Sequence, residues 1–126
     1  MSVLIDADVL IGVLRDDPGA NGAVAAARRR DPRLLSIAPV RTEVLRGMRP
    51  GEEEVTVGLL RLLDWVAVDT DLADRAGELG RIYRPTHPKI EVVDLLLAAA
   101  AERFHGELLT RNVRHFPMIP GLRPAY

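Results

Sequence analysis

The sequence contains no cysteine, few aromatic residues and a single lysine. The absence of cysteine excludes disulfide bonds, thiolate metal sites and cysteine nucleophiles. Because aromatic residues make up only 4% of the 126 positions, the core must consist mainly of Leu, Val, Ile and Ala. Lys89 is accompanied by 16 arginines, whose planar forks suit carboxylates and phosphates. A genome composition that favours Arg codons is the simpler explanation of this bias.

The chain also lacks a strong net charge and a long apolar run. Its formal net charge of −1 creates no global field for nucleic acid. No apolar run approaches the roughly 20 residues of a membrane span, and no basic region precedes a long apolar stretch at the N-terminus. Without repeats or linkers, we expect one domain over residues 1–126 of a soluble, cytoplasmic protein that has no membrane partner.

Short apolar runs alternate with helical patterns along the chain. The runs predict strands at 2–6, 33–38, 65–69 and 107–111, and the segments between them predict helices at 9–15, 20–30, 39–47, 55–64, 71–84 and 90–104. Met118 and Ile119 are a candidate edge strand. The alternation predicts an α/β fold with a central parallel sheet of four to five strands and helices on both faces. Ligands bind such sheets at the carboxyl ends of strands, where Asp6 lies.

Three carboxylates have apolar neighbours on separate predicted elements. Asp6 lies between two apolar runs, Glu43 shares a helix face with Val40 and Val44, and Asp94 interrupts "VVDLLLAAAA". Such a carboxylate raises its pKa or acquires a compensating cation. Taken singly, each has an ordinary explanation: a helix cap, a solvent-facing acid or an ion pair with arginine. Together they predict a Mg²⁺ or Mn²⁺ site, which can activate water for attack on a phosphodiester.

The Asp-x-Asp pattern that begins at Asp6 occurs a second time in "VAVDTD". An ordinary amphipathic helix follows this second copy, so Thr70 or Asp71 is the predicted N-cap. By the same reasoning we expect Asp8 to cap the helix after the first strand, or at most to support a metal ligand without binding the metal itself, and Asp6 remains available for metal. The pattern alone is therefore weak support for a metal site.

Four segments in order resemble the PIN domain, and specifically the VapC-type toxins of toxin–antitoxin pairs: "LIDADVLI", "APVRTEVLRG", "EVVDLLLAAAA" and "LLTRNVRHFPMIPGL". The resemblance spans nearly the whole chain. It implies a PIN-like domain with a Mg²⁺- or Mn²⁺-dependent ribonuclease site that cuts tRNA, rRNA or mRNA and inhibits translation. It also implies a homodimer that a cognate VapB-type antitoxin silences.

The resemblance assigns catalytic and metal-binding roles to Asp6, Glu43 and Asp94, the acids that stand out by their neighbours. Where the family carries a fourth acid, this sequence has Asn112, which offers an oxygen without a charge. We therefore expect one firmly held ion. Arg111 and Arg114 border this segment and are predicted to bind RNA phosphates, although pairing with nearby acids is an equal alternative.

Two rival functions remain at this point. "LIDADVL" also resembles the first motif of haloacid-dehalogenase-like phosphatases, in which Asp6 would be the nucleophile. Those enzymes need a later lysine and a final acidic pair, but Lys89 lies between two predicted helices and no late Asp-Asp pair follows. The second rival is a catalytically weakened PIN-like module that binds RNA or protein, a reading that Asn112 supports.

Overall fold

Four short parallel strands form the central sheet. In the computed structural model, which describes residues 2–126, they run in the order β3-β2-β1-β4. Their bounds are β1 Val3–Ile5, β2 Leu34–Ile37, β3 Leu63–Val66 and β4 Glu107–Leu109. Every residue of β1 and β2 is buried, because helices cover both faces of the sheet. This burial explains why these strands read as continuous apolar runs rather than as alternating patterns.

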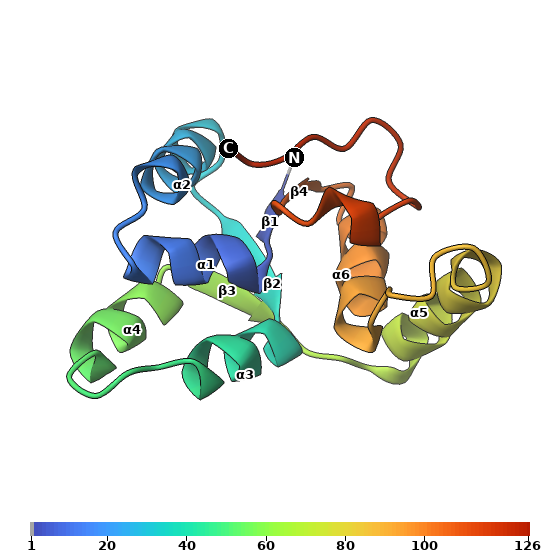
Figure 1. Cartoon of the computed structure of the whole chain (residues 1–126), viewed down its shortest axis with the longest axis horizontal. Helices are drawn as coiled ribbons and strands as arrows, with labels where there is room; N and C mark the ends of the chain where they lie inside the picture. The colour runs from blue at the N-terminus through green and yellow to red at the C-terminus, as the bar shows by residue number, and fades with distance from the viewer. Residues whose placement is uncertain (1) are drawn as a thin grey trace.

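The helices form two groups on opposite sides of the sheet (Figure 1). The first group is α1 Ala7–Leu14, α2 Pro18–Arg30, α3 Ala38–Arg46 and α4 Glu53–Leu60, and the second is α5 Thr70–Tyr83 and α6 Val92–Arg103. The chain proceeds outward from β1 to β2 and β3, then crosses back to place β4 on the other side of β1. Because such crossovers are right-handed, reversing the direction moves the later helices to the opposite face.

The strand order reverses between β1 and β4, and this is the switch point at which ligands bind in sheets of this kind. Asp6 follows β1 and Thr110 follows β4. The two strand ends are joined, since the backbone N–H of Asp6 donates to the carbonyl of Leu109 at 2.9 Å. The fold therefore sets Asp6 at the expected ligand-binding position.

Helix α6 explains the most apolar segment of the sequence. All residues from Asp94 to Ala101 are buried, because α6 packs against α5 on one side and against the sheet on the other. Asp94 is the single acid of this buried stretch and lies in the first turn of the helix. It is therefore held at the same edge of the sheet as the end of β1.

The structure confirms the α/β fold and corrects three predicted elements. The helix predicted at 55–64 ends at Leu60, and β3 begins at Leu63 rather than at Trp65. Met118 and Ile119 lie in a turn and a bend rather than in an edge strand. The tail is instead tied to the sheet by the N–H of Ala125, which donates to the Thr110 carbonyl at 2.8 Å. Among residues 2–126, no helix has both the length and the apolar character needed to cross a bilayer.

Candidate active site

Asp6 is held at the junction of β1, β4 and α1. One carboxylate oxygen accepts the backbone N–H of Ala7 at 2.7 Å, and the other accepts the hydroxyl of Thr110 at 2.8 Å. The side chain is buried, with the residue only 8% exposed. Both neutral donors fix the orientation of the carboxylate and neither neutralises its charge.

Asp8 lies in the first turn of α1, and its predicted role as the helix cap is wrong. The N-cap is Asp6, because the helix begins directly after the strand and leaves no room for a later cap. Asp8 Oδ2 instead accepts the backbone N–H of Arg111 at 2.9 Å. Its Oδ1 is buried and has no hydrogen-bond partner among the described residues. An unpaired buried carboxylate oxygen is costly, so this atom points to a missing ligand.

Asp94 is the third residue of α6 and forms a capping box with Glu91. Its Oδ2 accepts the Glu91 backbone N–H at 2.9 Å and lies 2.9 Å from Nδ1 of His115. The partner of Asp94 is thus a histidine from the 3₁₀ helix η1 (Val113–His115), rather than an arginine. The contact connects α6 with the segment after β4.

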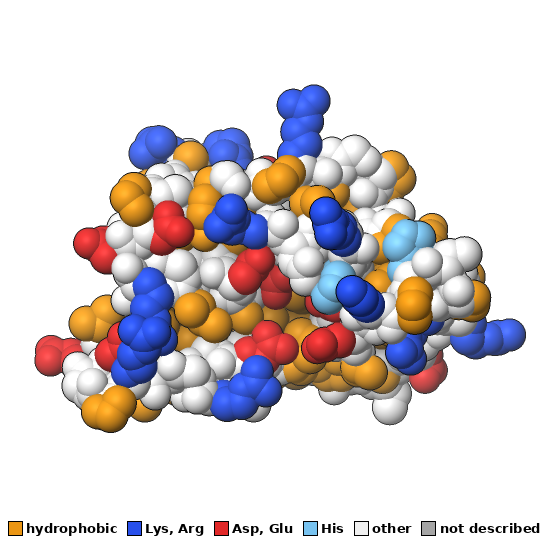
Figure 2. Space-filling model, viewed as in Figure 1, with side chains coloured by type: hydrophobic (Ala, Val, Ile, Leu, Met, Phe, Trp, Pro, Cys, Tyr) orange, Lys and Arg blue, Asp and Glu red, His pale blue; other side chains and the backbone are white. Residues whose placement is uncertain are grey.

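The carboxylates converge on one hollow of about 170 Å³, which we call the acidic hollow. It is lined by Asp6, Ala7, Asp8, Glu43, Glu91, Asp94, Asn112 and His115. Figure 2 shows acidic side chains at the centre of this face, with basic and histidine side chains around them. The structure thereby brings together Asp6, Glu43, Asp94 and Asn112, which the sequence predicted from four separate elements. It adds Glu91, which the sequence reasoning did not place in the site, and it puts Asp8 in the lining itself, where the sequence predicted a helix cap or at most a supporting group.

The acidic hollow carries uncompensated negative charge. Burial and then the charge of Asp8 raise the pKa of the Asp6 carboxyl to about 7, against the opposing hydrogen bond from Thr110. Burial likewise raises the pKa of Glu43. Arg46 lowers this pKa, but the negative charges of the other acids in the hollow raise it again. Within residues 2–126, no arginine or lysine forms an ion pair with any acid of the hollow.

The donor set fits a hard divalent cation. Carboxylate oxygens and the amide oxygen of Asn112 are ligands that Mg²⁺ and Mn²⁺ prefer, and the orphaned Oδ1 of Asp8 is free to serve as one. In the described part of the chain, no three His, Asp or Glu side chains already surround a common point. Asp94 Oδ2 is also engaged by His115. The acidic hollow therefore has suitable donors, which would draw closer around an ion.

The two predicted phosphate-binding arginines lie at the rim rather than in the acidic hollow. Arg114 lines an adjoining pocket together with Lys89, Asn112 and His115. The guanidinium of Arg111 lies over the ring of Tyr126, 4.7 Å from its centroid. Across residues 2–126 neither arginine pairs with an acid, so the alternative of ion pairing is wrong for both. Their phosphate-binding role stays a prediction.

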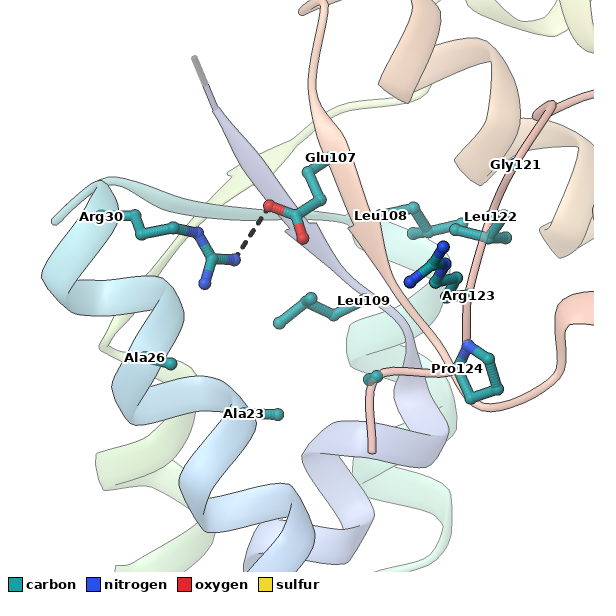
Figure 3. Close-up of a pocket in the computed structure, with 11 residues that line it drawn as sticks. Ala23, Ala26, Arg30, Glu107, Leu108, Leu109, Gly121, Leu122, Arg123 and Pro124 are labelled. Atoms are coloured by element: carbon teal, nitrogen blue, oxygen red, sulfur yellow. Dashed lines mark hydrogen bonds and ion pairs between the residues drawn. The ribbon is translucent and has the colours of Figure 1, made fainter.

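A second groove, on the other side of β4, lacks the features of a reaction site. Figure 3 shows it between α2, β4 and the C-terminal segment, and its volume is about 360 Å³. Glu107 is the one acid in its lining, and Arg30 neutralises that carboxylate at 2.9 Å. The one acid of the larger groove is thus neutralised, whereas the acids of the smaller acidic hollow have no arginine or lysine partner within residues 2–126.

Sequence comparisons connect the chain with ribonucleases. A profile of the family described as "PIN domain" matches residues 3–121. Ribonuclease VapC19 of Mycobacterium tuberculosis is 37% identical over 123 residues, which cover 98% of each chain. Ribonuclease VapC10 of the same organism is 36% identical over 124 residues, covering 98% of this chain and 92% of that one.

Solved structures with the same fold come from toxin–antitoxin complexes. A chain of a toxin–antitoxin complex from Klebsiella pneumoniae superposes with a TM-score of 0.83 at 26% identity, covering 98% of both chains. A chain of VapBC-1 from nontypeable Haemophilus influenzae superposes with a TM-score of 0.78 at 18% identity, covering 99% of this chain and 98% of that one. At this lower identity the likeness concerns the fold alone.

Proposed function

Because the chain belongs to the PIN domain family, we propose that it is a metal-dependent ribonuclease and the toxin of a toxin–antitoxin pair. The observation that carries this proposal is the acidic hollow at the switch point of the sheet, where the buried Asp6 and Asp94 meet further acids and none of them pairs with an arginine or lysine of residues 2–126. The names of the similar ribonucleases support the reaction. The haloacid-dehalogenase reading is not favoured, since Lys89 lies outside the hollow.

Asp6, Glu43 and Asp94 are the proposed metal-binding residues, and Asp8 joins them through its free Oδ1. Mg²⁺ or Mn²⁺ bound here would supply a Lewis acid that activates water for attack on an RNA phosphodiester. Asn112 contributes an uncharged oxygen, which favours one firmly held ion over two. Asp6 is the central ligand of the proposed set. Thr110 orients its carboxylate, and because burial raises its pKa most, a bound cation would stabilise its charged form most.

Arg111 and Arg114 are the proposed contacts to the RNA backbone. Both are exposed and carry no carboxylate partner in the described residues, so their guanidinium groups are available to phosphates as bidentate donors. They lie beside the acidic hollow, where they offset its repulsion of a polyanion. Phosphate contacts position a substrate without reading its sequence.

The proposed partner is a VapB-type antitoxin that silences the toxin. The similar structures support it, because they are chains of toxin–antitoxin and VapBC complexes. A homodimer is proposed on the same family ground. The site of action is the cytoplasm, where cleavage of tRNA, rRNA or mRNA inhibits translation.

RNA cleavage by the purified protein tests the proposal. We expect cleavage of cellular RNA with Mg²⁺ or Mn²⁺, no cleavage with EDTA, and growth arrest when the protein is expressed alone. Asp94→Asn should abolish both effects while the circular dichroism spectrum is unchanged. Asp74→Asn, an exposed acid-to-amide change on α5, is the matched control and should remain toxic. Full toxicity of Asp94→Asn, or cleavage that EDTA does not affect, would contradict the proposed mechanism.

A further inference from the structure

The guanidinium of Arg111 is held in place although it makes no ion pair. Its backbone N–H is fixed at the rim of the acidic hollow, donating to Asp8 Oδ2 at 2.9 Å. Its side chain extends to the ring of Tyr126 and lies 4.7 Å from the centroid. An aromatic face attracts a guanidinium without using its N–H groups. Arg111 therefore combines a fixed position with donors free for another ligand.

Tyr126 is seated in a slot that two glycines leave open. A Cβ on Gly19 would overlap the ring, lying 2.9 Å from its Cγ, and a Cβ on Gly12 would lie 2.9 Å from its hydroxyl oxygen. The neighbouring Ala125 N–H donates to the carbonyl of Thr110 at 2.8 Å. The ring is thus located by α1, α2 and the end of β4, and two of these elements, α1 and the end of β4, also locate Asp6.

The slot sets the distance between Arg111 and the acidic hollow. Gly12 follows Asp8 by one turn of α1, which corresponds to about 6 Å along the helix axis. The guanidinium over Tyr126 consequently lies beside the hollow instead of in it. A cation in this position does not compensate the acids, but it can hold a phosphate next to the one that reacts. Prior fixation lowers the entropy lost when that phosphate binds.

We propose that Arg111, laid on the ring of Tyr126, forms a subsite for the RNA phosphate flanking the cleaved one, and that Tyr126 is its positioning residue. The inference rests on the proposed ribonuclease function. It assigns a role to Tyr126, which no motif of the sequence indicates. It also gives Gly12 and Gly19 a common function, because both make room for the same ring.

Binding and kinetics of the full chain test the subsite. Affinity is measured by fluorescence anisotropy with a labelled single-stranded RNA in EDTA, and kcat and KM are measured with Mn²⁺. Arg111→Gln should raise Kd and KM about tenfold and reduce the slope of log K against log salt by about 0.7. Tyr126→Ala should raise Kd and KM about three- to tenfold, with kcat within about twofold of wild type, whereas Tyr126→Phe should restore wild-type values.

Arg123→Gln is the matched control. It removes the same charge from the C-terminal segment, at the groove beyond β4 (Figure 3), and should leave Kd and KM unchanged. Gly19→Ala is a second way to disturb the ring, because the added methyl group would displace Tyr126. In a Tyr126→Ala background the space is free, so adding Gly19→Ala should cause no further loss. This non-additivity distinguishes displacement of the ring from general destabilisation.

Two failures are distinguishable. If the wild-type protein neither binds nor cleaves RNA, the proposed function is wrong and the subsite falls with it. If the wild-type protein cleaves RNA but Arg111→Gln and Gly19→Ala bind it as tightly as Arg123→Gln does, the subsite alone is wrong. A loss of kcat at unchanged KM in Tyr126→Ala also overturns the inference, because it would place the effect on the reaction instead of on phosphate binding.

Discussion

The β1–α1 and β3–α5 junctions both place an Asp-x-Asp segment between a strand and a helix, and in both the first aspartate is the N-cap. Asp69 accepts the N–H of Leu72 at 2.8 Å, and the Arg103 guanidinium binds both of its oxygens at 3.0 and 3.1 Å. Asp6 accepts only the neutral donors Ala7 N–H and the Thr110 hydroxyl. Asp69 is exposed, whereas Asp6 is buried.

The pKa values of the two carboxyl groups are consequently shifted in opposite directions. The hydrogen bond from Arg103 lowers the pKa of Asp69, whereas burial raises the pKa of Asp6 to about 7. A strand followed by Asp-x-Asp thus makes a helix cap at either junction. It becomes a candidate reaction site only where other elements add acids without an arginine or lysine partner, as α3 and α6 do around Asp6.

Removing the carboxylate charge at each junction should have the largest and most unequal effects on RNA cleavage. Asp6→Asn should lower the rate of RNA cleavage by more than about 100-fold, since even groups that only support metal ligands cost 10- to 100-fold. Asp69→Asn should stay within about twofold of wild type, because its partner is Arg103 on the outer surface. Initial rates with a labelled RNA measure both. Equal losses in the two variants would show that the junctions do not differ in function.

The pH dependence of stability should differ between wild type and Asp6→Asn. The pKa of Asp6 is about 7 in the folded protein and near 3.8 in the unfolded chain, so the folded state binds the extra proton between these values. Stability of the metal-free protein should therefore fall as pH rises from about 4 to about 7. Asp6→Asn should remove this fall and be more stable above pH 7 by a few kcal/mol. Urea unfolding in EDTA measures it; parallel pH profiles would exclude the effect.

Thr110→Val removes one of the two neutral donors that bind the Asp6 carboxylate. The fully buried hydroxyl donates to Asp6 and accepts the N–H of Asn112 at 3.0 Å. Its loss leaves buried polar groups unpaired, which should cost about 1–3 kcal/mol in thermal unfolding. Thr110→Ser keeps both bonds and should recover most of this loss. If Thr110→Val is as stable as wild type, the hydroxyl does not orient Asp6 as described.

Arg103→Gln removes the compensation at the other junction and should have the smallest effect. The pKa of Asp69 should rise towards its ordinary value, because the Arg103 guanidinium lowers it in the wild type. The carboxyl carbon of Asp69, followed by NMR during a pH titration, reports this change. RNA cleavage should remain within about twofold of wild type. A large loss of cleavage would extend the functional region to α5.

Much of the fold and the membership of the acidic hollow followed from local patterns. Asp6, Glu43 and Asp94 each have apolar neighbours in sequence, so burial of their backbones was predictable one element at a time. The parallel topology then brought their three elements to the same edge of the sheet. Their metal-binding and catalytic roles remain predictions, because geometry shows proximity and not chemistry.

The missed features depend on side chains that reach across the fold. Asp8 was assigned as a cap because local spacing cannot show a hydrogen bond to Arg111, which is 103 residues away in sequence. Asp69 caps α5 where Thr70 or Asp71 was predicted, because the helix begins one residue earlier than its apolar periodicity indicates. The position of Tyr126 depends on Gly12 and Gly19, and no local pattern relates these three residues.

Titration of the metal-free protein with Mn²⁺ by isothermal calorimetry at neutral pH tests whether the acidic hollow binds a divalent cation through Asp6. The acidic hollow should bind Mn²⁺ in the wild type and in Asp69→Asn with the same affinity, and binding should be lost in Asp6→Asn and Asp94→Asn. Because Asp6 is partly protonated near neutral pH, binding should also release protons, which makes the measured heat depend on the buffer. Mn²⁺ binding of equal strength in wild type and Asp6→Asn would contradict the account.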